Sequence, residues 1–399
     1  MRKTASIIAF VLALVVCIGS VPMPDMQTYC YVEEETAAEY AESFIDEQIA
    51  VGIADNWNDS TQIAETVYTY DTDGYINGYI FNLETNGEES GYIVLDALDY
   101  NLMNVTAFGL ENKYHLTDEE LFPELENRAI VNNGLLDYCY KKNNKYYDAE
   151  SGTELTATKT ELKEVHAENI AITNQIKIQS EIQKAENSIK LASADEYEYL
   201  ELVQEVNLPN IESFRVWTMN DFRFNGKFDN HCGPTAIMNM MKYWVDCRDI
   251  DMRQLFFTTC SSQYNENATF NKVSSYVRST PTSGTYPDTA FRMLRKYFED
   301  YNKKMPVGDD YVKKYYIDWA WLKTQFANGN PMYLRLGYRT ERKYTVDYPH
   351  AVLGVGAYYS NWTGNNYVRI VDGWERSTKN YVEYTYNYSF DCAWYYRWA

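Results

Sequence analysis

The sequence is poor in the residues that build metal centres and has few long apolar runs. Only four of its 399 residues are histidine, and its seven cysteines lack the paired C-x-x-C spacing typical of zinc sites. Beyond the N-terminus, no apolar run is long enough to cross a bilayer as a helix. We therefore expect no metal ion, no other cofactor, no disulfide framework and no transmembrane segment.

Basic residues are scarce in one half of the chain only. Residues 1–214 hold 12 Lys and Arg against 39 Asp and Glu, a net charge of −27, whereas residues 215–399 hold 24 against 18, a net charge of +6. The overall charge of −21 argues against nucleic acid as a partner. Opposite charges on two tethered halves favour intramolecular docking of the acidic N-terminal half, although acidity alone also keeps an exported protein soluble.

Residues 1–20 have the pattern of a signal peptide. It has a positive start at Arg2 and Lys3, an apolar run over residues 7–18 and small residues before the cleavage point. We expect the mature protein to be secreted or to lie at the cell surface. A lipoprotein anchor at Cys17 is the alternative, but the Val before it matches that signal poorly.

Residues 33–110 predict a small acidic α+β module. A helix is expected from residue 33, with one face formed by Ala37, Ala41, Phe44, Ile45 and Ile49. Four strands are expected after the helix, over residues 67–70, 75–83, 91–97 and 105–108. Turn residues rich in Asp, Asn and Gly separate the first three strands and predict an antiparallel meander.

Residues 111–205 predict a partly helical connector. Helical composition, rich in Glu, Lys, Gln and Ile, covers residues 119–132 and 159–192. The apolar spacing within the second stretch fits neither the helical nor the strand period well. We expect this segment to pack only in part, or to order against the domain that follows.

A cysteine stands immediately before a strongly patterned helix. Ile237, Met240, Met241 and Trp244 fall at i, i+3, i+4 and i+7, so the run from Pro234 predicts a helix with one apolar stripe. Cys232 lies at the start of that helix, where the positive end of the helix dipole favours the nucleophilic thiolate. A buried structural cysteine is the alternative interpretation.

A cysteine nucleophile needs an imidazole partner, and the chain offers four. His115 and His166 lie in the acidic half, and His231 adjoins the cysteine, where its side chain should point elsewhere. His350 is left, at the start of an apolar run that predicts a buried strand over residues 351–358.

A second strand, over residues 367–371, ends at Asp372. If the two strands pair as a hairpin, the start of one meets the end of the other, which brings Asp372 near His350. The alternatives are an ordinary histidine at a strand end and an ordinary turn residue before Gly373.

Three motifs carry a resemblance to known enzymes. Asn-His-Cys-Gly-Pro-Thr-Ala around Cys232, Pro-His-Ala-Val-Leu-Gly-Val-Gly around His350 and Val-Asp-Gly-Trp around Asp372 resemble papain-like cysteine peptidases. Within that clan they are most similar to the thirty-ninth cysteine-peptidase family, whose founding members trim bacteriocin leaders, and to its secreted relatives. The resemblance covers residues 210–399. It implies Cys232 as nucleophile, His350 as general base and acid, and Asp372 as the residue that orients the imidazole.

One position departs from that family. The family usually places a Gln about six residues before the cysteine to bind the oxyanion, whereas position 226 of this chain is Gly. The nearest amides are Asn225 and Asn230. We expect Asn225 to take the role, with Asn230 or the backbone N–H of Cys232 as the alternatives.

The predicted fold class is α+β, with a papain-like domain after the small N-terminal module. Helices are expected over residues 234–244, 289–302 and 319–328, and strands over residues 331–336, 351–358, 367–371 and 381–386. Helices first and antiparallel strands second is the papain-like layout, in which the helix that carries the nucleophile packs on the sheet that carries the base. The N-terminal strands loosely resemble the propeptide of streptopain-type peptidases, with a generic scaffold or adhesion module as the alternative.

These observations predict a secreted cysteine peptidase that hydrolyses peptide or protein substrates, with an N-terminal half that acts as propeptide or inhibitor. Two alternatives stay open. A cell-wall amidase or a transpeptidase would use Cys and His at the same places on the same fold. A non-catalytic surface-binding protein would keep the fold without the chemistry, and the missing Gln supports that interpretation.

Overall fold

The computed structural model of this chain describes most of the sequence after the predicted signal peptide. The described residues are 32–398 except 98–102, 127, 133–137, 151, 165–166, 168–177, 179–180, 183–204, 223–230, 253–254, 257–264, 281–283, 302–303, 314–316, 337–349 and 385–389. The predicted signal peptide, with Cys17, lies outside them, so export and anchoring stay predictions.

The N-terminal half contains the predicted helix and meander. Its elements are α2 (Glu34–Ala50), β1 (Thr61–Tyr70), β2 (Ile76–Thr85), β3 (Glu88–Ala97) and β4 (Met103–Gly109). Each strand pairs antiparallel with the next along the chain. Helix α2 buries Ala37, Ala41, Phe44 and Ile45, and it contacts β2 and β3. The predicted helix and all four predicted strands are confirmed.

The turn between β2 and β3 is tighter than the sequence suggested. Asn86 and Gly87 alone connect the two strands, and their φ angles are 56° and 80°. A two-residue turn with positive φ at both positions matches the right-handed twist of the strands that it joins. Asn and Gly reach that conformation at low cost, which is why the strands run closer to the turn than predicted.

The following segment is less helical than predicted. It forms the short 3₁₀ helices η2 (His115–Thr117) and η3 (Pro123–Leu125) and the strands β5 (Ile130–Asn132), β6 (Tyr138–Lys142) and β7 (Lys145–Asp148). The helix predicted over residues 119–132 is wrong. Pro123 disfavours helical backbone at Phe122, and Ile130 instead pairs in parallel with Thr69 of β1. Residues 159–164 are helical, and most of the predicted helix beyond them lies outside the described residues.

The C-terminal half holds the remaining elements. They are β8 (Val206–Asn207), η4 (Ile211–Ser213), η5 (Met219–Asp221), α5 (Cys232–Arg248), α6 (Glu266–Tyr276), α7 (Pro287–Tyr301), β9 (Gly308–Lys313), α8 (Trp319–Ala327), β10 (Met332–Leu336), β11 (Ala351–Tyr359), β12 (Asn366–Val371), β13 (Asn380–Tyr384) and β14 (Phe390–Arg397). The predictions of α5, α7, α8 and β10 to β13 are confirmed. Helix α6 and strands β9 and β14 were not predicted.

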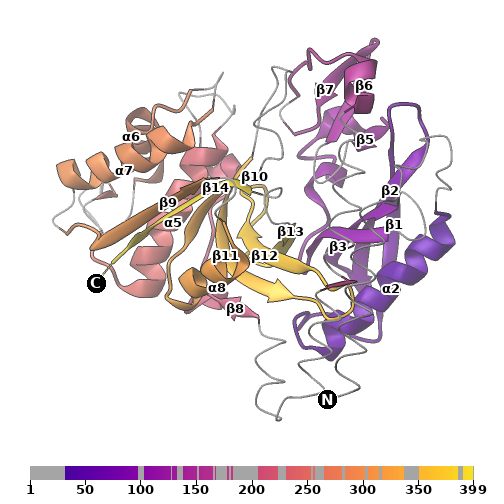
Figure 1. The fold of residues 1–399 in the computed structure, drawn as a ribbon, viewed down its shortest axis with the longest axis horizontal. Coiled ribbons are helices and arrows are strands. Elements are labelled where there is room, and N and C mark those ends of the chain that lie inside the picture. The colour runs from indigo at the N-terminus through magenta and orange to yellow at the C-terminus, as the bar shows by residue number, and fades with distance from the viewer. Residues whose placement is uncertain are drawn as a thin grey trace, which may run out of the picture.

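One sheet runs through both halves of the molecule (Figure 1). Its strand order is β7-β6-β5-β1-β2-β3-β4-β13-β12-β11-β10-β14-β9, and β8 pairs with β11. The halves meet where β4 pairs antiparallel with β13, with Phe108 opposite Tyr381 and Ala107 opposite Val382. In Figure 1 the indigo and magenta strands of the N-terminal half lie to the right, and the orange and yellow strands lie to the left. The predicted α+β class is therefore confirmed.

Buried apolar side chains cross the boundary between the halves. The rings of Phe108 and Tyr381 stack with centroids 4.5 Å apart and planes 1° apart. The ring of Tyr40 in α2 packs against that of Trp362, in the loop between β11 and β12, with centroids 4.4 Å apart. The core beneath α2 therefore includes tyrosines of the C-terminal half, namely Tyr358, Tyr367 and Tyr381.

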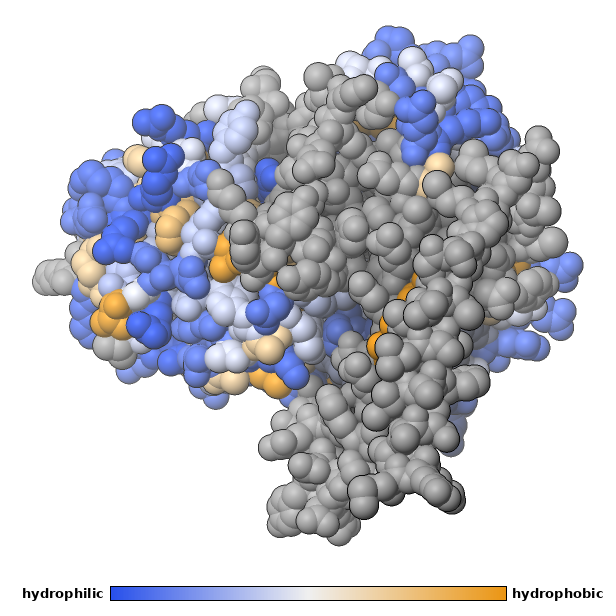
Figure 2. Space-filling view, in the orientation of Figure 1, coloured by the Kyte–Doolittle hydropathy of each residue, from blue (hydrophilic) through white to orange (hydrophobic). Residues whose placement is uncertain are grey.

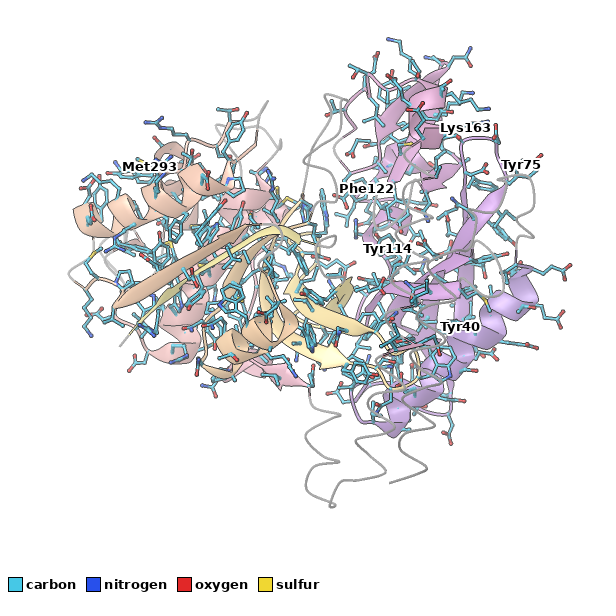
Figure 3. The ribbon with its side chains drawn as sticks, in the orientation of Figure 1. Tyr40, Tyr75, Tyr114, Phe122, Lys163 and Met293 are labelled. Carbon is cyan, nitrogen blue, oxygen red and sulfur yellow. The ribbon has the colours of Figure 1, made fainter. Side chains whose placement is uncertain are left out.

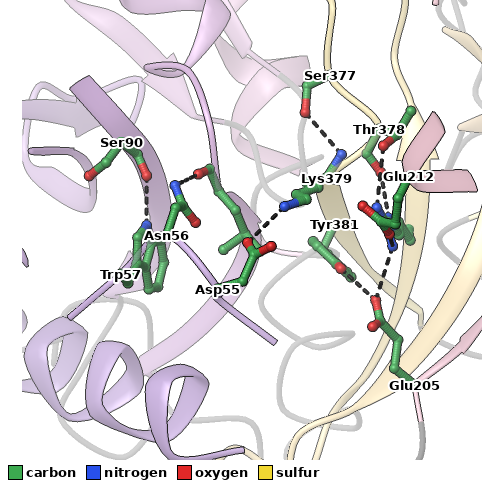
Figure 4. A network of polar contacts seen from close by, with 12 residues as sticks. Asp55, Asn56, Trp57, Ser90, Glu205, Glu212, Ser377, Thr378, Lys379 and Tyr381 are labelled. Carbon is green, nitrogen blue, oxygen red and sulfur yellow. Dashed lines mark hydrogen bonds and ion pairs between the residues drawn. The ribbon is translucent and has the colours of Figure 1, made fainter. Parts of the chain in front are cut away.

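Polar contacts at the boundary are buried as well as exposed. The buried amide of Asn104 donates to Glu383 at 2.8 Å, and Asn365 donates to Asn104 at 2.6 Å. Near the surface, Lys379 and Asp55 form an ion pair at 2.7 Å (Figure 4). Buried hydrogen bonds resist salt screening better than exposed ion pairs do.

The visible surface is mostly hydrophilic over α6 and α7 and over β6 and β7, as Figure 2 shows. Within the part of the chain that the structure describes, no helix is long and apolar enough to span a membrane. The four cysteines in that part, Cys139, Cys232, Cys247 and Cys392, form no disulfide.

Because both halves share a sheet and a core, we predict that they unfold together. Denaturation followed by tryptophan fluorescence, which reports mainly on the C-terminal half, should coincide with denaturation followed by far-UV circular dichroism. Phe108→Ala should lower the free energy of unfolding by about 3–5 kcal/mol without splitting the transition. Tyr75→Ala, at a side chain that is 59% exposed, is the control and should change it by about 0.5 kcal/mol or less. Two separate transitions in the wild-type chain would contradict this prediction.

Candidate active site

Cys232 is the first residue of α5, two positions before the predicted start of the helix. The first backbone hydrogen bond of the helix runs from Thr235 N–H to His231 carbonyl at 3.0 Å. The predicted apolar stripe is buried and holds the helix against β10 and β11; it consists of Ile237, Met240, Met241 and Trp244. The thiol therefore lies at the helix N-terminus, on the side of the sheet that α5 covers.

Gly233 allows α5 to approach its neighbours closely. A Cβ atom at this position would lie 2.6 Å from the Thr285 hydroxyl and 3.2 Å from the Tyr333 hydroxyl. Any larger residue would force the Thr285 side chain or the start of the helix to shift. The glycine after the cysteine is thus required by packing beside the thiol.

The predicted hairpin brings His350 to the end of β12. Strand β11 pairs antiparallel with β12, and Leu353 faces Val371 near the open end. His350 Nε2–H donates a hydrogen bond to the main-chain carbonyl of Asp372. The imidazole also forms a side-chain hydrogen bond with Cys232. The three residues predicted as catalytic are therefore neighbours in the fold.

Asp372 contacts the imidazole through its backbone, whereas its carboxylate is occupied elsewhere. One oxygen accepts from the backbone N–H of Trp374 at 2.9 Å and of Glu375 at 3.4 Å. The other oxygen accepts from the Asn380 side chain at 2.8 Å. The carboxylate therefore shapes the turn that points the Asp372 carbonyl at His350.

The thiol and the imidazole stabilise each other as an ion pair. Burial alone would raise the pKa of Cys232, but the hydrogen bond from His350, its positive charge and the N–H groups of Ala351 and Gly233 bring it below its ordinary value. Burial alone would lower the pKa of His350, but the hydrogen bond to Cys232, the charge of Glu150 and the Asp372 carbonyl raise it to about 10. Both shifts favour the thiolate–imidazolium form of the pair.

Trp374 stacks on His350 with centroids 5.5 Å apart and planes 12° apart. Two aromatic residues of the N-terminal half also pack against Trp374. The ring centroid of His115 lies 5.6 Å from that of Trp374, and the ring centroid of Phe122 lies 5.1 Å from it. Figure 3 shows Phe122 on the side of the N-terminal half that faces the C-terminal half. The sequence placed His115 only in the acidic half of the chain, and no local pattern marks its contact with Trp374.

His231 points away from the thiol, as expected from its position beside Cys232. Its buried ring donates a hydrogen bond from Nε2 to the Met219 carbonyl at 2.8 Å. The ring also packs edge-to-face with Phe270. Asn225 and Asn230, the candidates for oxyanion binding, lie outside the described residues, so their role stays a prediction. No group of three His, Cys, Asp or Glu among the described residues could hold a metal ion.

Comparison with solved structures gives a distant likeness. No family model matches the chain, and no curated protein matches it. A solved structure described as a "putative C39-like peptidase" from Bacillus anthracis is 13% identical to the matched part, which covers 48% of this chain and 97% of that one, with a TM-score of 0.31. The assignment of the candidate site therefore rests on the contacts within this structure.

The ion pair predicts unusual reactivity of Cys232 at mildly acidic pH. His350→Ala removes the partner that lowers the pKa of the thiol, so less thiolate should be present below pH 7. Alkylation of Cys232 by iodoacetamide at pH 6 should slow on the order of tenfold for each unit by which the pKa rises. Labelling of the Cys232→Ala variant gives the background from other cysteines. Equal rates in the wild type and the His350→Ala variant would rule out the pair.

The contacts of Asp372 predict different effects for two substitutions. Asp372→Ala should lower kcat on the order of tenfold, because the turn loses the hydrogen bonds that direct the carbonyl to His350. Asp372→Asn should stay close to the wild type, since its amide can accept from Trp374 and donate to Asn380, whose Oδ1 has no partner among the described residues. Steady-state kinetics with one peptide substrate measure both. If Asn is as damaging as Ala, the negative charge of Asp372 matters more than the turn.

Proposed function

We propose that this chain is an exported cysteine peptidase of papain-like layout that hydrolyses peptide bonds with Cys232, His350 and Asp372. The observation that carries the proposal is the hydrogen-bonded series from the Cys232 thiol at a helix N-terminus through His350 to the Asp372 carbonyl. A nucleophile, a base beside it and a group that orients the base are the parts required for covalent catalysis of acyl transfer. The placement of α5 against β10 and β11 supports the papain-like layout.

The chemistry follows from the ion pair. The Cys232 thiolate attacks the peptide carbonyl carbon, and the imidazolium of His350 then gives its proton to the departing amine as the C–N bond breaks. The neutral imidazole next takes a proton from water, whose oxygen attacks the acyl carbon and releases the carboxylic acid and the thiolate. The hydrogen bond to the Asp372 carbonyl keeps Nε2 protonated in the neutral state, so Nδ1 is the nitrogen that exchanges the proton.

The oxyanion that forms during each attack needs hydrogen-bond donors. The backbone N–H groups of Ala351 and Gly233 already point at the sulfur and mark the region as rich in donors. We propose Asn225 as a further donor, in place of the Gln that similar peptidases carry.

The N-terminal half is proposed to dock on the peptidase half within the same chain. Its action as a propeptide or inhibitor stays a prediction. The pairing of β4 with β13 and the shared core support a lasting association, since removal of the N-terminal half would uncover Phe108, Tyr367 and Tyr381 on both sides of the boundary.

A protease assay with matched cysteine variants tests the proposed function. Cys232→Ala should abolish the hydrolysis of casein and labelling by an epoxide inhibitor while the protein stays folded. Cys247→Ala, a buried cysteine on the same helix, is the control and should keep both. Turnover of peptidoglycan but not casein would favour the amidase alternative, and the absence of labelling and of turnover would favour the non-catalytic one. Hydrolysis by the Cys232→Ala variant at the wild-type rate would end the proposal.

A further inference from the structure

The N-terminal half contributes a polar pair, a buried histidine and a half-buried glutamate, near the proposed catalytic imidazole. His115, only 6% exposed, stacks on Trp374 with planes 11° apart, and Trp374 stacks on His350. His115 Nε2 lies 3.2 Å from Glu150 Oε1, and the Glu150 side chain is 27% exposed. A series of direct contacts thus runs from Glu150 through two rings to His350.

This arrangement is built into the fold of the N-terminal half. Glu150 follows β7, and the N–H of the neighbouring Ala149 donates to the Tyr138 carbonyl at 3.0 Å. The N–H of Tyr114, the residue before His115, donates to the Asn82 side chain in β2 at 3.0 Å. Both residues of the pair are therefore tied to the sheet that continues into the C-terminal half through β4 and β13.

The charge of Glu150 acts on the catalytic pair. The negative charge of Glu150 helps to raise the pKa of His350, and the positive charge of His350 helps to lower the pKa of Glu150, where burial alone would raise it. The Asp372 carboxylate, the group that usually faces an imidazole in a triad, is bonded instead to the following turn and to Asn380.

Two other carboxyl groups, those of Asp372 and Glu375, lie at this turn. Cys232 meets His350 from α5, and Asp372 meets it with its main-chain carbonyl from the end of β12. Burial and then the charge of Asp372 raise the pKa of Glu375 to about 9, which favours its neutral form. The negative charges of Glu150 and of the Cys232 thiolate both raise the pKa of His350; Cys232 contacts the imidazole directly, and Glu150 lies beyond the rings of Trp374 and His115.

We propose that His115 and Glu150 are positioning residues of this active site, with Glu150 supplying the negative charge that stabilises the imidazolium and His115 holding both Glu150 and Trp374 in place. This inference rests on the proposed function. The N-terminal half is then a lasting part of the catalytic centre, and its removal should lower activity. Removal of an inhibitory propeptide would have the opposite effect and raise activity.

The direct test is an NMR titration of the His350 imidazole in the full-length chain, where His350→Ala identifies its signal among four histidines. Glu150→Gln keeps the shape and the acceptor for His115 but removes the charge. It should lower the pKa of His350 by about half a unit or more. Glu154→Gln, an exposed carboxylate paired with Lys145, is the matched control and should leave it unchanged. The same pKa in the Glu150→Gln variant and the wild type would overturn the proposal.

Activity supplies a second readout. His115→Phe keeps the ring on Trp374 but loses the hydrogen bond to Glu150, so the alkaline limb of kcat/KM should move to lower pH as in Glu150→Gln. His115→Ala also loses the ring and should lower kcat several-fold. Faster hydrolysis by the His115→Ala variant would overturn the proposal, because the contact would then restrain the enzyme.

The titration also separates the two proposals. If His350 of the wild-type chain titrates near the ordinary histidine value, the ion pair with Cys232 is absent, and both the proposed function and the role of Glu150 fail. If His350 titrates high in the wild type and in Glu150→Gln alike, only the role of Glu150 fails.

Discussion

The pairing of β4 with β13 is the contact on which the rest of the structure depends. It makes the N-terminal meander a continuation of the sheet that carries the hairpin of His350. Separation of the halves would exchange the hydrogen bonds between β4 and β13 for hydrogen bonds to water, at a net cost of about 0.5–1.5 kcal/mol each, and would expose the stacked rings of Phe108 and Tyr381. Side chains on the two sides of this boundary therefore keep a fixed geometry, which allows His115 to contact Trp374.

The candidate active site pairs two groups whose charged forms burial by itself would disfavour. A half-buried thiolate and a half-buried imidazolium stabilise each other, and dipoles that are already oriented stabilise both. The N-terminus of α5, the N–H of Ala351 and the carbonyl of Asp372 supply such dipoles from three different elements. The chemistry thus depends on the packing of α5 against the sheet as much as on the identity of Cys232 and His350.

Much of this architecture could be predicted because it is encoded locally. The stripe at Ile237 and Met241 repeats with the period of a helix, and the apolar runs beside His350 and Asp372 are bounded by turn residues. Prediction failed over residues 119–132, where composition indicated a helix but the edge of β1 offered backbone partners to Ile130. Helix α6 and strand β14 were missed because their stabilisation comes from the packing of side chains such as Phe270 and Trp394 in the core.

The sequence by itself determined that Cys232 would lie at the start of a helix, that His350 would lie at the start of a strand and that Asp372 would lie at the end of the strand beside it. Each of these placements follows from apolar spacing and turn chemistry within a few residues. Only the tertiary structure decided that Asp372 approaches His350 through its carbonyl and that His115 and Glu150 lie beside the site. These contacts join segments far apart in the chain, and they depend on the register of β4 against β13, which no local period encodes.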